Sequence, residues 1–132
     1  MFLFLTRGIL LRNRRLLGRW GERYAQKYLK GKGYIPLAFN FKSRSGEIDL
    51  VTRSKDGTFV FVEVKTRGFK EFLPAVNAVN KKKQRNITNA ARQFIRKHGI
   101  FDQPQRYDII TIVLPRKGKP KLTHYPNAFY PA

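Results

Sequence analysis

Two apolar segments separated by a short turn signal limit the folds open to this chain more than any other feature. Residues 46–53 (GEIDLVTR) and 58–65 (TFVFVEVK) are rich in β-branched and aromatic side chains, and KDG stands in the turn region between them. This pattern predicts two antiparallel strands joined as a hairpin. An isolated hairpin is marginally stable in water, so other elements of the chain must cover it.

The length of the turn decides which side chains of the hairpin share a face. A two-residue turn would place Asp49 and Glu63 on opposite faces, whereas a three-residue loop with Gly57 in the left-handed conformation makes them face each other. The three-residue loop also gathers apolar side chains on one face, namely Ile48, Leu50, Val60, Val62 and Val64. We therefore predict this loop, with Asp49 opposite Glu63 and Glu47 opposite Lys65.

The rest of the chain supplies elements that can cover the hairpin. Apolar residues at helical spacing predict helices from Gly18 to about Lys32 and over residues 76–98, with Gly99 as the stop of the second. Further strands are predicted at residues 34–41, 106–114 and 121–125, the first near a sheet edge because it carries Pro36. The run RYDIITIVL is apolar on both faces, as in a strand covered on both sides. The order α-β-β-β-α-β-β indicates an α/β fold with a mixed sheet flanked by helices, forming one domain over residues 16–132.

Residues 1–15 form a basic N-terminal extension in which apolar clusters alternate with arginines. The extension lacks both an uninterrupted apolar stretch and a small-residue cleavage site, so it predicts neither a signal peptide nor stable membrane insertion. We expect an amphipathic helix, which would either add a helix to the fold or lie on lipid or nucleic-acid phosphates.

The charge balance points to a polyanionic partner. The chain has 28 Lys and Arg residues against 8 Asp and Glu residues, a net charge of +20. Nucleic acid is the first candidate, although an anionic membrane surface, an acidic protein or a ribosome would satisfy the same charge. A hydrophobic fraction of 42% argues against a disordered polycation. The absence of cysteine excludes disulfides and thiolate metal sites and fits the reducing cytoplasm.

Because acidic side chains are scarce, their positions are informative. Asp49 and Glu63 lie on the two strands of the hairpin, and Lys65 lies two residues beyond Glu63. Two carboxylates on adjacent strands offer the hard oxygen ligands that Mg²⁺ or Mn²⁺ prefers, and a lysine beside them can stabilise an attacking hydroxide. Cross-strand ion pairs on a solvated face are the alternative. We favour the metal site because these charges interrupt strongly apolar strands, where an unpaired carboxylate would be costly to bury.

The motifs GEIDL, FVEVKTR, AVNKKKQ and RYDII, in this order, resemble the uncharacterised bacterial YraN-type family. That family is similar to archaeal Holliday junction resolvases in the restriction-endonuclease-like PD-(D/E)xK superfamily. The resemblance runs from about Gly18 to Phe129 and includes NAF at residues 127–129, where the family has Asp-Ala-Phe. It departs from the superfamily pattern at Ile48, which stands where proline is usual before the aspartate.

The resemblance implies a nuclease site. Glu22, Asp49 and Glu63 would hold the metal, Lys65 would stabilise the nucleophile and the transition state, and Gln84 would orient the attacking water. Glu22 could instead lie at the solvent-exposed margin of the apolar stripe of its helix, with no role in metal binding. A phosphate-binding patch is predicted from five basic residues: Arg67, Lys81, Lys82, Lys83 and Arg85. For Lys83, extension from the helix face into solvent is an equally good interpretation.

The residues and the resemblance together predict a Mg²⁺- or Mn²⁺-dependent endonuclease acting on branched or flapped DNA, with DNA favoured over RNA. The alternative is a nucleic-acid-binding protein that keeps the scaffold without cleavage. A peripheral membrane or ribosome-bound basic protein is a third class. Related resolvases act as dimers, so the resemblance also implies a homodimer. Outside this site we expect Asp108 to pair with Arg106 or another base, and we assign no role to His98 or His124.

Overall fold

The computed structural model describes residues 2–69 and 79–131. Within these residues, eight elements follow one another: α1 (Phe2–Arg12), α2 (Arg14–Gly31), β1 (Ile35–Ser43), β2 (Gly46–Arg53), β3 (Phe59–Gly68), α3 (Lys81–His98), β4 (Gln105–Leu114) and β5 (Lys121–Tyr125). The predicted order is confirmed, with α1 added before it. The helix expected from Gly18 begins four residues earlier, because the Asn13 side chain accepts a hydrogen bond from the Leu16 N–H at 3.1 Å and so caps the helix at Arg14.

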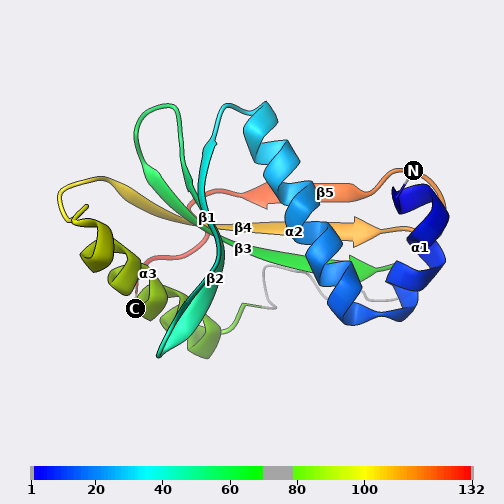
Figure 1. Cartoon of the computed structure of the whole chain (residues 1–132), viewed down its shortest axis with the longest axis horizontal. Helices are drawn as coiled ribbons and strands as arrows, with labels where there is room; N and C mark the ends of the chain where they lie inside the picture. Colours follow the sequence, from blue (N-terminus) through cyan, green and yellow to red (C-terminus); the bar gives the residue numbers. More distant parts are fainter. Residues whose placement is uncertain (1, 70–78, 132) are drawn as a thin grey trace.

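The five strands form one mixed sheet in the order β1-β2-β3-β4-β5. β3 and β4 are parallel, and every other neighbouring pair is antiparallel. A parallel pair needs a crossover connection, which contains α3. α2 and α3 lie on opposite faces of the sheet (Figure 1). The mixed sheet flanked by helices is therefore as predicted.

Each face of the sheet carries its own apolar cluster. On one face, α2 contributes Leu17, Trp20, Ala25 and Leu29 to a cluster with Leu50, Val60, Val62, Val64 and the β4 residues Ile110, Ile112 and Leu114. On the other face, α3 packs Ile87, Ala91 and Phe94 against Ile48, Val51, Phe61 and Ile109. The middle of β3 and β4 is buried throughout. This double coverage explains why these strands are apolar at consecutive positions.

The hairpin has the predicted turn. The Gly57 N–H donates to the Ser54 carbonyl and the Ser54 N–H donates to the Thr58 carbonyl, so three residues form the loop, and Gly57 has φ +89°. The ladder runs from Arg53–Phe59 to Leu50–Val62. Continued by one step, this register places Asp49 opposite Glu63.

Two details of the hairpin prediction were wrong. Ile48 packs against α3 while Leu50 packs toward α2, so these two side chains do not share a face. The β2–β3 ladder also ends at Leu50–Val62, and Glu47 therefore has no ladder partner in Lys65. Both differences arise because the first half of β2 leaves β3 and follows α3 instead.

The second of the two predicted helices, α3, starts later than the sequence suggested. Asn80 caps α3 by accepting a hydrogen bond from the Lys83 N–H at 2.9 Å, so Val79 is buried ahead of the helix and not within it. Val76, the predicted start, lies outside the described residues. The helix ends as predicted, with Gly99 at φ +64°.

The N-terminal helix is held against the far end of the sheet. The Arg7 guanidinium donates to the carbonyls of Pro115, Arg116 and Gly118 at 3.3, 3.2 and 2.9 Å, and Leu10 is buried in the α2-side cluster. These contacts make α1 part of the folded structure. Within the described residues, no helix combines the length and apolar character needed to cross a bilayer.

Candidate active site

The site forms where β2 and β3 separate. Beyond the Leu50–Val62 pair the two strands no longer exchange backbone hydrogen bonds, and the Asp49 carboxylate accepts the Val64 N–H at 2.8 Å. The side chain thus takes the place of a strand as acceptor for a backbone group that would otherwise lack one. This arrangement fixes Asp49 in the gap between the strands.

Asp49 and Glu63 meet in that gap. The two carboxyl groups lie close enough for one to donate a hydrogen bond to the other when it carries a proton. Burial, and next the charge of Asp49, raises the pKa of Glu63 to about 8. Burial also raises the pKa of Asp49, against the opposing effect of the Val64 hydrogen bond. Two buried carboxyls this close cannot both stay ionised without nearby positive charge.

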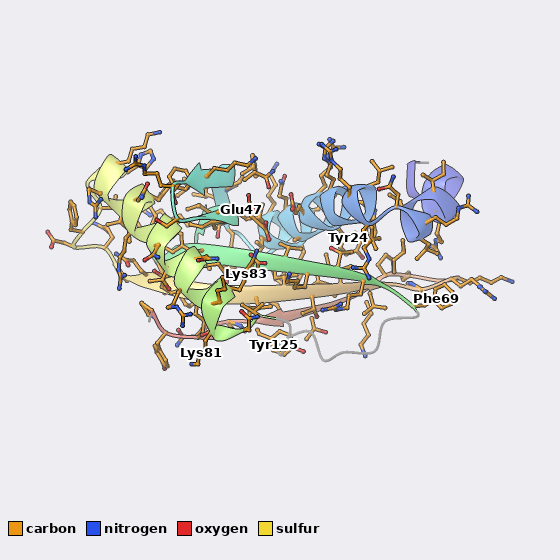
Figure 2. The ribbon with its side chains drawn as sticks, turned by 90° about the horizontal axis from the view of Figure 1, so that it is seen from below. Tyr24, Glu47, Phe69, Lys81, Lys83 and Tyr125 are labelled. Carbon is orange, nitrogen blue, oxygen red and sulfur yellow. The ribbon has the colours of Figure 1, made fainter. Side chains whose placement is uncertain are left out.

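Two lysines supply that charge from different elements. The Glu63 Oε2 atom lies 3.7 Å from the Lys65 ammonium on β3 and 3.5 Å from the Lys83 ammonium on α3. Figure 2 shows Lys83 on the part of α3 that crosses β3 in this view, and Glu47 on β2. Lys83, which the sequence placed in the phosphate patch, is therefore part of the carboxylate cluster.

Glu22 approaches the same cluster from α2. Gly21 makes this possible, because a Cβ there would come within 1.8 Å of the Thr66 Oγ1 atom on β3. Burial and then the charge of Asp49 raise the pKa of Glu22 to about 7. The electrostatic coupling of Glu22 to Asp49 is consistent with the predicted role of Glu22, which stays a prediction.

A second close approach positions α3. A Cβ on Gly46 would lie 2.3 Å from the Asn86 carbonyl oxygen, so glycine allows β2 to pack directly on the helix backbone. In the first turns of α3, the Gln84 side-chain amide donates to the Val79 carbonyl at 3.0 Å. Gln84 thus ties the helix to the preceding segment, and its predicted role in orienting water is untested by this contact.

The remaining predicted basic residues lie on the two elements that carry Lys65 and Lys83. Lys81, Lys82 and Arg85 are exposed on the first half of α3, while Arg67 is half-buried on β3. Glu63, Lys65 and Arg67 occupy every second position of β3, so their side chains lie on the same side of the strand. Their role in phosphate binding stays a prediction.

Sequence reasoning missed Asn40. This residue has φ +49° and lies opposite Asp49 in the β1–β2 register, and its side chain acts to lower the pKa of Glu22, against the effect of burial. Asparagine tolerates the left-handed region better than other non-glycine residues. An asparagine in the middle of an apolar strand was the signal that could have identified it.

Asp108 belongs to a separate network. It accepts two hydrogen bonds from Arg106 at 2.9 and 2.8 Å, one from the Asn127 N–H at 2.9 Å, and contacts His124 Nε2 at 2.7 Å. The predicted pairing with Arg106 is confirmed. His124, to which no role was assigned, links Asp108 to the Tyr28 hydroxyl.

The donor set suits a hard divalent cation. Asp49 and Glu63 offer carboxylate oxygens, the ligands that Mg²⁺ and Mn²⁺ prefer. Within residues 2–69 and 79–131, however, no group of three or more Asp, Glu, His or Cys side chains is arranged to hold a metal ion. A two-carboxylate site would fit a cation that keeps several water ligands.

The fold and this cluster define a small α/β protein with a carboxylate–lysine centre at a splayed β-hairpin. The chain belongs to the uncharacterised protein family UPF0102, whose model matches residues 21–112. It is 42% identical over 115 residues to a UPF0102 protein of Syntrophomonas wolfei, covering 87% of this chain and 98% of the relative. A Geobacter metallireducens UPF0102 protein is 44% identical over 114 residues, covering 86% of this chain and 91% of the relative. A Trichlorobacter lovleyi UPF0102 protein is 40% identical over 114 residues, covering 86% of this chain and 89% of the relative.

Proposed function

We propose that this protein is a Mg²⁺- or Mn²⁺-dependent endonuclease that hydrolyses phosphodiester bonds in branched or flapped DNA. The observation that carries the proposal is the buried Asp49–Glu63 pair with ammonium groups 3.7 and 3.5 Å from Glu63. A protein that only binds phosphate gains nothing from two carboxyls at the site, because they repel it. The cysteine-free composition supports placing the activity in the cytoplasm.

Each residue of the proposed site would have its own role in the reaction. Asp49 and Glu63 would hold the metal, with Glu22 able to complete the set from α2. When bound, the metal would lower the pKa of a water molecule and neutralise charge on the phosphate. Lys65 and Lys83 would stabilise the negative charge that develops as the water oxygen bonds to phosphorus and the phosphorus–oxygen ester bond breaks. Gln84 would help orient that water.

Metal binding should depend on pH, because Asp49 and Glu63 must be ionised to act as ligands. The affinity for Mn²⁺ should therefore rise between pH 6 and about pH 8, the pKa of Glu63. Isothermal titration calorimetry with MnCl₂ at several pH values measures this directly. A pH-independent affinity would contradict the carboxyl pair as the ligand set.

Cleavage assays test the activity itself. The full chain is incubated with single-stranded, duplex, flapped and four-way DNA and with matching RNA, in Mg²⁺, Mn²⁺ or EDTA. We expect metal-dependent cutting of the flapped or four-way DNA, lost in Asp49→Asn and in Lys65→Ala. The exposed Glu47→Gln serves as the acidic control. Cutting that survives both EDTA and Asp49→Asn would remove the metal-site assignment.

A second candidate function is nucleic-acid binding without cleavage. It is favoured by one observation, that the described residues contain no preformed group of three metal-ligating side chains. Binding without cutting on every substrate and metal would support it. In EDTA, Asp49→Asn should bind DNA as tightly as wild type or more tightly, since it removes a negative charge near the phosphate.

A further inference from the structure

An exposed apolar strip runs along β1, beside the proposed active site. Ile35, Leu37 and Phe39 are exposed on this strand, with exposed fractions of 58, 43 and 50%, and the register with β2 shifts between Pro36 and Ala38, so Leu37 and Phe39 lie beyond a strand irregularity from Ile35. β1 stands at the end of the strand order, at the open edge of the sheet within the described residues (Figure 1). Three exposed large apolar side chains on one edge strand are unusual for a surface that meets only water.

The outward position of Phe39 follows from the backbone irregularity at Asn40. Ala38 and Phe41 both pack against the α3-side cluster, although residues three apart on a regular strand point to opposite faces. Asn40, with φ +49°, lies between Phe39 and Phe41 and breaks the alternation. As a result Phe41 contacts Phe94 in the core, with ring centroids 5.3 Å apart, while Phe39 stays exposed. Strained backbone of this kind tends to persist at functional positions.

The same irregularity links Phe39 to the proposed active site. Phe39 pairs with Leu50 in the β1–β2 register, and the next step along the register places Asn40 opposite Asp49. Phe39 is therefore one residue along the strand from Asn40, which faces the proposed metal ligand Asp49.

The positive charge around these exposed side chains favours one class of partner. Lys42 and Arg44 are exposed farther along the same β1–β2 hairpin, and the whole chain carries a net charge of +20. A second copy of the chain would bring an equal positive charge against this edge. Single-stranded nucleic acid offers what the strip lacks, since it combines negative phosphates with flat apolar bases that stack on aromatic side chains.

We propose that Phe39, flanked by Leu37, is a stacking platform for an unpaired nucleobase next to the proposed active site. This inference rests on the proposed function, because it names the DNA feature the site engages. The protein would bind where a duplex opens into a single strand, with the first unpaired base on Phe39 and the backbone on the basic residues. Loss of one such base stack lowers affinity by about tenfold.

The test is a binding measurement in EDTA, where cleavage plays no part. Fluorescence anisotropy gives the affinity of the full chain for a forked oligonucleotide and for an unbranched duplex of the same length. We expect Phe39→Ala to lose about tenfold in fork affinity with little change on the duplex, and Phe39→Trp to restore fork binding. The matched control is Phe101→Ala, which removes another exposed phenylalanine, 65% exposed, and should leave both affinities unchanged.

A crosslink fixes the position of the base. With 5-iododeoxyuridine at the first unpaired position of the fork, irradiation should crosslink the peptide that contains Phe39, and the same label inside the duplex should not.

Equal fork affinity for wild type and Phe39→Ala would overturn the inference. It would also be overturned if wild type sedimented as a dimer without DNA and Phe39→Ala as a monomer that lost fork and duplex affinity equally, because the strip would then cover a second copy. Fork binding without any cleavage would leave the inference standing while refuting the endonuclease proposal.

Discussion

At the scale of single residues, ionisation of the Asp49–Glu63 pair lowers the stability of the fold, although the proposed metal site needs the ionised form. The fold raises the pKa of Glu63 from its ordinary value of 4.5 to about 8, mainly because the carboxyl is buried. The folded state therefore binds a proton more tightly than the unfolded chain, so this contribution to stability is complete below pH 4.5 and is lost as the pH rises through about 8. If Glu63 binds a metal ion, as proposed, the protein accepts this loss of stability at alkaline pH.

The first prediction follows from this linkage. In EDTA, Glu63→Gln should show a smaller fall in Tm between pH 5 and pH 8.5 than wild type, and it should be the more stable protein at the alkaline end by about 3 °C. Calorimetry across this pH range measures both quantities. Glu47→Gln, which changes an exposed glutamate of the same region, should follow the wild-type curve. Parallel curves for wild type and Glu63→Gln would mean that Glu63 ionises as freely in the fold as in the unfolded chain.

Asp108 shows the opposite behaviour at a buried position without a proposed catalytic role. Burial alone would raise the pKa of Asp108, but hydrogen bonds from His124 and Arg106 outweigh it and lower the pKa. The stability that Asp108 provides is thus present above its unfolded pKa of 3.8 and is lost as the pH falls through the folded value.

We predict that Asp108→Asn destabilises the protein by about 3 kcal/mol near neutral pH, because it leaves the Arg106 guanidinium without its charged partner. Urea unfolding monitored by circular dichroism measures this loss. Mn²⁺ affinity should stay at the wild-type value below the unfolding transition, since the network is separate from the carboxyl pair. A loss of Mn²⁺ affinity in the folded variant would show that the two regions are coupled.

At the scale of elements, the close approach of α2 to β3 carries Glu22 toward the cluster. Gly21→Ala would place a methyl group 1.8 Å from the Thr66 Oγ1 atom, so the helix must move outward. We expect a loss of stability of about 2 kcal/mol. In the double variant Gly21→Ala/Thr66→Ala the hydroxyl is gone, and the combined loss should be smaller than the sum of the two single losses. Additive losses would show that the helix accommodates the methyl group without meeting Thr66.

The elements themselves were largely predictable, because each depends on local signals. The KDG turn fixed the register that brings Asp49 and Glu63 together, and Gly99 fixed the end of α3. The face change between Ile48 and Leu50 was not predictable from periodicity, since it arises where β2 leaves β3 to pack on α3. The pairing of His124 with Asp108 joins two strands through tertiary structure, and no spacing rule indicates it.

At the scale of the whole molecule, the charge distribution decides how the protein meets a polyanion. Each lysine or arginine that contacts a phosphate releases counterions, so affinity falls with salt in proportion to the number of contacts. With several contacts, affinity for DNA should fall by roughly a thousandfold between about 50 and 200 mM salt. This steep dependence alone does not locate the binding face, because any cationic surface would produce it.

Paired variants of equal charge locate that face. Lys81→Ala/Lys82→Ala removes two exposed charges from the start of α3, beside the carboxyl cluster, and Lys27→Ala/Lys30→Ala removes two exposed charges from α2. Both variants have the same net charge, so they differ only in where the charge was lost. We expect the α3 variant to reduce the slope of log affinity against log salt by about 2, and the α2 variant to keep the wild-type slope. Anisotropy titrations over a salt series give these slopes. Equal losses in both variants would mean that net charge alone holds the nucleic acid, with no oriented approach to Asp49 and Glu63.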